Sequence, residues 1–178
     1  MVGSGKESAM FGRQIAALRV NRPEFKKLQN YVLGSSAAII TNASLIVGLG
    51  SARAGKGPIL GGLLTIALAD NISDSLGIHL YKESEGCGER LSLLATVLNF
   101  SSRLLVSFSF IAMVLMFPVS QAIVLGVVWA LVLLTFVSFL ITQSNHENSV
   151  LEILKHILVA VVVIALSRWV GDLIAHYF

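Results

Sequence analysis

Two carboxylates stand inside an apolar run that is long enough to cross a lipid bilayer. Asp70 and Asp74 lie within the segment Pro58–Tyr81, and about 20 residues suffice for one helical crossing. A spacing of four places both side chains on one helix face. An ionisable group at membrane depth costs roughly 2.5–3.5 kcal/mol on insertion scales, so it usually marks a functional site or an ion pair. Two neighbouring carboxylates suit a hard divalent cation or a shared proton.

The same helix face carries further polar or small side chains. They are Ser73, Gly77 and Tyr81, whereas Leu68, Ile72, Leu76 and Leu80 form a separate aliphatic row. We expect the polar row to face protein or a water-filled path. Asn42, near the middle of the first apolar segment, would add a carbonyl oxygen, or else form an ordinary interhelical hydrogen bond. The predicted metal ligands are therefore Asp70, Asp74, Ser73 and Asn42.

The third apolar segment offers a competing partner for the aspartates. One helix face of this segment carries Ser92, Thr96, Asn99, Arg103 and Ser107. Because Arg103 and Asp70 both lie near mid-span, an ion pair of Arg103 with either aspartate is the alternative to a metal site. Arg103 and Asn99 are accordingly predicted as ion-pair or gating residues. Even with the ion pair, the three charged groups sum to one negative charge, which still allows a cation or proton role.

The composition predicts a membrane protein. The chain has 178 residues, of which 55% are hydrophobic and 13% charged, with a mean hydropathy of +0.80, whereas soluble domains carry about 25% charged residues. Five apolar segments are separated by short polar or turn-forming stretches: Tyr31–Ser51, Pro58–Tyr81, Leu91–Phe117, Val119–Thr142 and Val150–Ile174. We therefore expect an all-α polytopic fold, with a five-helix transmembrane domain over residues 31–178.

Residues 1–30 form a basic segment before the first span. Six of the 13 basic residues lie there: Lys6, Arg13, Arg19, Arg22, Lys26 and Lys27. The apolar residues Met10, Phe11, Ile15 and Leu18 share one helical face, which predicts a short interfacial helix that Pro23 ends. The distribution of basic residues favours a cytoplasmic N-terminus. Membrane lipid is the expected partner of this segment, and nucleic acid is not, because no recognition motif accompanies the charge.

The chain offers little for enzymatic chemistry. Cys87 is the single cysteine, and no Ser-His-Asp constellation or paired-histidine zinc motif is visible. The stretch 50–57 nearly matches a phosphate-binding loop, but Gly57 stands where the magnesium-binding hydroxyl belongs. We expect neither an enzyme nor a resident cofactor, so that a divalent cation would be cargo.

Small residues recur along the first span. Ala37, Thr41, Ser44 and Gly48 form a row at three- and four-residue spacing. Such rows let transmembrane helices approach closely. The row predicts close helix packing, either within the chain or across a homodimer.

The second span resembles the vacuolar iron transporter family. The family pattern there runs Ala-Asp, one residue, Ile or Leu, Ser-Met, two residues, Gly, an acidic residue and an aromatic, and the corresponding stretch is residues 69–79. The positions that match are Asp70, Ser73 and Gly77. Weaker similarity lies at 32–34, 43–48, 151–152 and 171. The resemblance implies a five-helix homodimer with a central metal path, lined by the first two helices, that exports ferrous iron or manganese from the cytosol by proton antiport.

Several positions depart from the family pattern. Ala37 stands where the family has a pathway aspartate, Asp74 replaces a pathway methionine, and Ile78 replaces an acidic residue. Arg103 occupies a place where the family usually has a small residue. The chain also lacks the cytoplasmic metal-binding helices that many members insert between the second and third spans. Replacing a thioether by a carboxylate shifts ligand preference from iron toward harder cations such as manganese, magnesium or calcium.

Two main hypotheses follow. The first is a transporter of divalent metal cations, iron- or manganese-like, with proton-coupled export and the intramembrane aspartates as ligands. The second is a non-transporting membrane scaffold or interaction protein in which Arg103 neutralises Asp70 and Asp74. A carrier of another solute, with an anion path around Arg103, is a third hypothesis.

Overall fold

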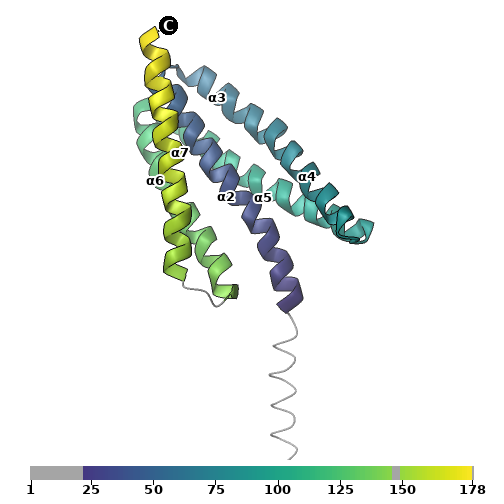
Figure 1. The fold of residues 1–178 in the computed structure, drawn as a ribbon. Coiled ribbons are helices and arrows are strands. Elements are labelled where there is room, and N and C mark those ends of the chain that lie inside the picture. The colour runs from purple at the N-terminus through teal and green to yellow at the C-terminus, as the bar shows by residue number, and fades with distance from the viewer. Residues whose placement is uncertain (1–21, 146–148, 178) are drawn as a thin grey trace, which may run out of the picture.

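The computed structural model describes residues 22–145 and 149–177, and these ranges are helical without any strand. The elements are α2 (Arg22–Ser51), α3 (Lys56–Thr65), the π-helical turn η1 (Ile66–Asp70), α4 (Asn71–Ser84), α5 (Glu89–Met116), α6 (Val119–Asn145) and α7 (Ser149–Tyr177) (Figure 1). Within the described ranges, five stretches are long and apolar enough to cross a membrane: α2 from Gly34, the unit α3–η1–α4, α5, α6 and α7. The predicted all-α polytopic fold is confirmed.

The helix that carries the first span begins before the predicted apolar segment, while the apolar span within it runs from Gly34 to Ser51. Helix α2 starts at Arg22 rather than near Tyr31, so Pro23 lies in its first turn. Proline is well tolerated there, because its missing N–H would have no partner in the first helical turn. Pro23 therefore opens α2, and its predicted role at the end of a preceding helix lies outside the described residues, as does the interfacial helix itself.

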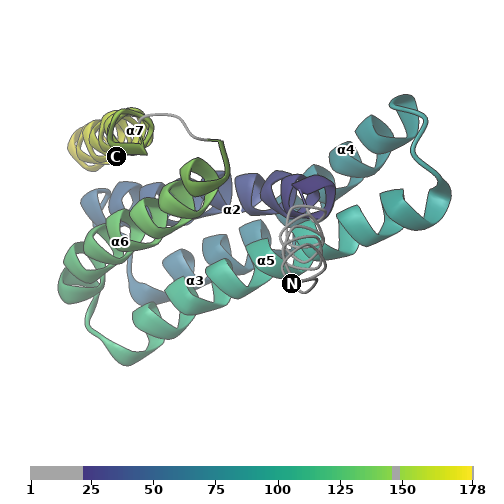
Figure 2. The ribbon, with the colours of Figure 1, turned by 90° about the horizontal axis from the view of Figure 1, so that it is seen from below.

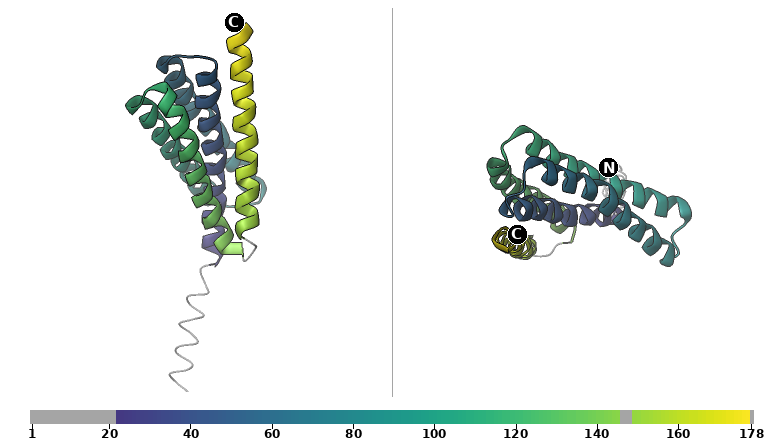
Figure 3. Two further views of the ribbon diagram at one scale, coloured as in Figure 1. Left: turned by 90° about the vertical axis from the view of Figure 1, so that its left-hand side faces the viewer. Right: turned by 90° about the horizontal axis from the view of Figure 1, so that it is seen from above.

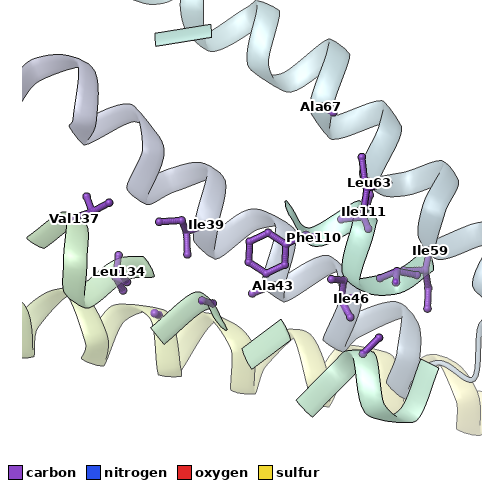
Figure 4. Packing of buried hydrophobic residues seen from close by; sticks show 14 residues of the cluster. Ile39, Ala43, Ile46, Ile59, Leu63, Ala67, Phe110, Ile111, Leu134 and Val137 are labelled. Carbon is purple, nitrogen blue, oxygen red and sulfur yellow. The ribbon is translucent and has the colours of Figure 1, made fainter. Parts of the chain in front are cut away.

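Helix α2 is the centre of the bundle. It packs against α3, α5, α6 and α7, and the views along and across the bundle show α7 and α3 flanking it (Figures 2 and 3). The apolar core lies where these helices meet (Figure 4). Its members include Ile39, Ala43 and Ile46 of α2, Ile59 and Leu63 of α3, Phe110 of α5 and Leu134 of α6.

The second span is one continuous helix with a π-helical turn in its middle. Residues 56–84 pass from α3 through the π turn η1 into α4 (Figure 1). A π turn accommodates one extra residue and rotates the following helix relative to the preceding one. The aliphatic row predicted on this span is more than half exposed in each member, which suits a surface that faces lipid: Leu68, Ile72, Leu76 and Leu80.

Helices α2 and α7 cross at glycines. A Cβ built on Gly171 would collide with the backbone oxygen of Gly48, and one built on Gly48 would lie 3.3 Å from the backbone oxygen of Ser167. Gly48 thus serves close packing within the chain. Thr41 and Ser44, of the same small-residue row, are partly exposed, and Ala37 is exposed.

Candidate functional site

Arg103 is the centre of a buried polar site between three helices. Its side chain is 1% exposed. Nε donates to Oδ1 of Asn71 at 3.0 Å, and Nη1 donates to the backbone oxygen of Gly34 at 2.8 Å. Nη2 lies 2.7 Å from Oδ2 of Asp70, and Nη1 lies 2.5 Å from Oδ2 of Asp74. The guanidinium therefore links α2, the η1–α4 segment and α5, with every nitrogen engaged.

Two helix faces bring these groups together. The polar face predicted on α5 is largely buried in the bundle: Ser92, Asn99, Arg103 and Ser107 are each at most 1% exposed. The opposing face comes from Ala67 inside the π turn and from Asn71 and Ser75 of α4, which are buried at four-residue spacing. Asp70 is the last residue of that turn. The aspartates flank the buried row and meet Arg103 at its edge.

A close helix approach completes the site. A Cβ on Gly34 would collide with Oδ1 of Asn99, so glycine is what allows α2 to lie against α5 here. The approach places the Gly34 carbonyl within reach of Arg103. Asn99 donates to Oγ of Ser75 at 3.1 Å and so joins α5 to α4.

The site carries one uncompensated negative charge. One guanidinium faces two carboxylates, each of which meets it through Oδ2. The side chains of Asp70 and Asp74 are 42% and 50% exposed. Their Oδ1 atoms are therefore available to a ligand outside the chain. Since both residues lie within a candidate membrane span, this excess charge is energetically costly unless a cation or proton is nearby.

The other predicted ligands lie apart from the aspartates. Ser73 is exposed on α4. Asn42 is fully buried, and its Nδ2 donates to Oγ of Ser107 at 3.1 Å and to the backbone oxygen of Ala38 at 2.8 Å. Among the described residues, no three His, Cys, Asp or Glu side chains gather as a metal-binding group. A single copy of the described chain thus supplies two carboxylates and no complete set of acidic ligands.

Asn71, Ser75 and Gly34 are parts of the site that the sequence analysis missed. The polar row predicted on the second span ran through the aspartates, whereas the innermost row runs through Asn71 and Ser75. Their four-residue spacing after Ala67 was the available signal. The sequence around Gly34 does not indicate its role, because that role depends on where α5 lies.

Two buried acceptors between α2, α4 and α5 have no hydrogen-bond partner among the residues that the structure describes. They are Oδ1 of Asn42 and Oδ1 of Asn99, and both residues are fully buried. An unsatisfied buried polar group costs about 1–3 kcal/mol. These unpaired oxygens lower the stability of the fold, so the interface between α2, α4 and α5 keeps polar groups that stability alone does not favour.

A second set of polar contacts lies at the α4–α5 turn. Nδ1 of His79 lies 3.2 Å from Oγ1 of Thr96, and its Nε2 lies 3.4 Å from Glu83. Glu85 accepts hydrogen bonds from Lys82 at 2.7 Å and from Tyr81 at 2.8 Å. The bond from Lys82, and then that from Tyr81, lower the pKa of the Glu85 carboxyl below its usual value. These contacts stabilise the turn between α4 and α5 and do not extend to Arg103.

The fold and its apolar helices define a multi-pass integral membrane protein of the all-α class. No family model matches the chain, and neither a curated protein nor a solved structure is similar enough to match it. The similarity to vacuolar iron transporters therefore stays a prediction that depends on the residues of the second span.

Proposed function

We propose that this chain is a cation transporter of the divalent metal class, iron- or manganese-like, with Asp70 and Asp74 as the intramembrane site. The observation that carries the proposal is the pair of half-exposed carboxylates with one uncompensated charge inside a membrane span. A carboxylate oxygen is a hard ligand that suits Mn²⁺ and similar cations. Proton exchange at the same oxygens would couple transport to a proton gradient.

The charge of the site suits a pair of chains. One copy contributes a net charge of minus one, so two copies facing each other match one divalent cation. In this arrangement Arg103 holds the Oδ2 atoms in place, and the cation meets the Oδ1 atoms. Arg103 is then a positioning residue, because it orients the ligands without touching the cargo.

An exposed row of small residues beside the aspartates supports a homodimer. The row follows the whole second span at four-residue steps, and every member is exposed: Gly57, Gly61, Thr65, Ala69, Ser73 and Gly77. A four-residue step drifts by about 40° around an α-helix, and the wide turn η1 counters part of that drift. Small residues at this spacing let transmembrane helices of two chains pack closely. Ala69 directly precedes Asp70 and Ser73 directly precedes Asp74, so such packing would bring two sites together.

The proposed orientation places the N-terminus in the cytoplasm. The basic residues of segment 1–30, together with Lys82 and Arg90 at the α4–α5 turn, would then lie on the cytoplasmic side, as the positive-inside rule favours. Export would carry the cation from this side toward the turn between α2 and α3.

Transport by the purified chain in liposomes tests the proposal. We expect the native chain to take up Mn²⁺, and Asp70→Asn to abolish uptake because the site loses its excess charge. The matched control is Asp172→Asn, which removes an exposed carboxylate of α7 paired only loosely with Arg168 at 3.8 Å. Uptake by Asp70→Asn at the native rate would reject the assignment.

A second candidate function has one specific observation in its favour. Arg103 contacts both aspartates directly, which is what the non-transporting scaffold predicts. The two candidates differ in cation binding. Calorimetric titration of the purified chain with Mn²⁺ supports transport if it finds a saturable micromolar site that Asp74→Asn removes. It supports the scaffold if the native chain binds no divalent cation.

A further inference from the structure

An apolar groove runs between α2 and α7, away from the Arg103 site. It has a volume of about 620 Å³, and Ile66 of η1 closes one side. Aliphatic side chains form most of its walls: Ile40, Leu45 and Leu49 of α2 and Val163, Leu166 and Val170 of α7. Its lining extends along α2 from Ile40 to Ala52, which is roughly 18 Å at the rise of an α-helix.

The groove lies within two candidate membrane spans and is open to their surroundings. Its occupant in a bilayer is therefore apolar and elongated. An extended acyl chain is slender enough to lie between two helices, and a bilayer supplies such chains at the depth of these spans.

Charged residues adjoin the lining of the groove near Ala52, where Gly171 of α7 lies against Ser51 and Ala52. Arg53 directly follows Ala52 and Lys56 follows four residues after it, whereas Arg168 and Asp172 of α7 face each other at 3.8 Å. Lys56 is occupied, because its Nζ donates to the backbone oxygen of Leu115 at 3.0 Å. Arg53 is exposed and makes no hydrogen bond or ion pair to another described side chain. Its guanidinium is available to an anion.

The backbone at Arg53 has the left-handed conformation of a helix end. Its φ is 58°, in the left-handed region that favours glycine. The N–H of Arg53 bonds the Gly50 oxygen at 3.1 Å and that of Ala54 bonds the Leu49 oxygen at 2.9 Å, which is the Schellman pattern that ends many helices. The left-handed conformation of Arg53 therefore ends α2, and glycine would adopt it without strain.

We propose that the groove binds an anionic phospholipid. One acyl chain lies between α2 and α7, and the phosphate meets Arg53 at the mouth next to Ala52. The planar guanidinium of arginine binds phosphate through two parallel hydrogen bonds.

Lipid-dependent thermal unfolding of the purified full chain in detergent tests the headgroup. We expect phosphatidylglycerol to raise the unfolding midpoint more than phosphatidylcholine with the same acyl chains. Arg53→Gly should fold well, because glycine suits the φ of this position, but its apparent Kd for phosphatidylglycerol should be about tenfold weaker, since it loses a charge-assisted hydrogen bond. The matched control is Arg90→Gln, an exposed arginine at the other end of the bundle, which should leave the preference unchanged.

Further arms separate the alternative occupants. Inorganic phosphate should not raise the midpoint, because it lacks the acyl chain. Thr41→Phe, which places a ring in the groove, should weaken binding of both phospholipids and leave the oligomeric state unchanged. The proposal is overturned if the two phospholipids act alike, if Arg53→Gly keeps the full preference, or if phosphate alone reproduces the effect. Dissociation of a dimer by Thr41→Phe would assign the groove to a second copy instead.

Discussion

Different interactions hold the two sides of α2 against the neighbouring helices. Toward α4 and the part of α5 up to Ser107 the contacts are largely polar, with Arg103 of α5 bonded to α2 and to the η1–α4 segment and with Asn42 bonded to Ser107. Toward α6 and α7 the contacts are apolar and close, with Ala122, Ala130, Leu134 and Ala160 buried and Gly48 against Gly171. The first side depends on charge and hydrogen bonds, and the second on the shape of backbones and small side chains.

This difference separates the half of the bundle that contains charged and unpaired polar groups from the half that only packs. In a bilayer the lipid tails are as apolar as leucine, so helices associate through close packing and interhelical hydrogen bonds. The apolar side uses small residues together with aliphatic side chains such as Leu134 and holds α6 and α7 as a scaffold. The polar side keeps two carboxylates half exposed and, among the described residues, two amide oxygens unpaired, which costs stability.

The largest expected effect is the loss of Arg103. Arg103→Leu leaves two carboxylates without a counter-ion and Asn71 without its donor. Removing one partner of a buried ion pair typically costs roughly 3–5 kcal/mol, so we expect the unfolding midpoint in detergent to fall steeply. The triple variant Arg103→Leu, Asp70→Asn, Asp74→Asn should recover much of the loss, because no charge remains. If the triple variant is as unstable as the single one, the arginine acts through packing alone.

On the apolar side, the largest expected effect comes from Gly171→Ala. The added Cβ meets the Gly48 oxygen and lies 2.8 Å from the Cβ of Ser51, so α7 must move away from α2. Overpacking of this kind costs about 1–3 kcal/mol, and the unfolding midpoint in detergent measures it. Gly88→Ala is the matched control, because a Cβ there meets no atom within 4 Å. Equal midpoints for the two variants would contradict the close crossing.

The sequence predicts the spans well but the rotation of one helix poorly. Hydropathy locates five apolar segments, and the spacing of polar residues identifies the buried face of α5. On the second span three neighbouring rows carry polar residues, so composition does not decide which row faces inward. The π turn at Ile66–Asp70 and the reach of Arg103 set that rotation, and neither has a local sequence signature. Asn71 and Ser75 were missed for this reason.

A smaller effect is expected at Gly34. Gly34→Ala pushes against Oδ1 of Asn99, a side chain that can rotate only by giving up its hydrogen bond to Ser75. The lost hydrogen bond is worth about 0.5–1.5 kcal/mol. A double-mutant cycle with Asn99→Ala checks the contact, since the two changes should be less harmful together than the sum of each alone. Additive effects would show that Gly34 and Asn99 act independently.

The smallest expected effect lies outside the membrane, at Glu85. Because Lys82 and Tyr81 stabilise its carboxylate, the folded pKa lies below the usual 4.5. A lowered folded pKa gives a stabilising contribution that is present above the unfolded value and is lost as the pH falls through the folded value. Glu85 is exposed, so salt should screen much of the effect. Titration followed by the NMR signal of the Glu85 carboxyl should show the midpoint rising in Lys82→Gln and rising less in Tyr81→Phe. The opposite order would mean that the tyrosine hydroxyl, and not the ammonium group, governs this end of the hairpin.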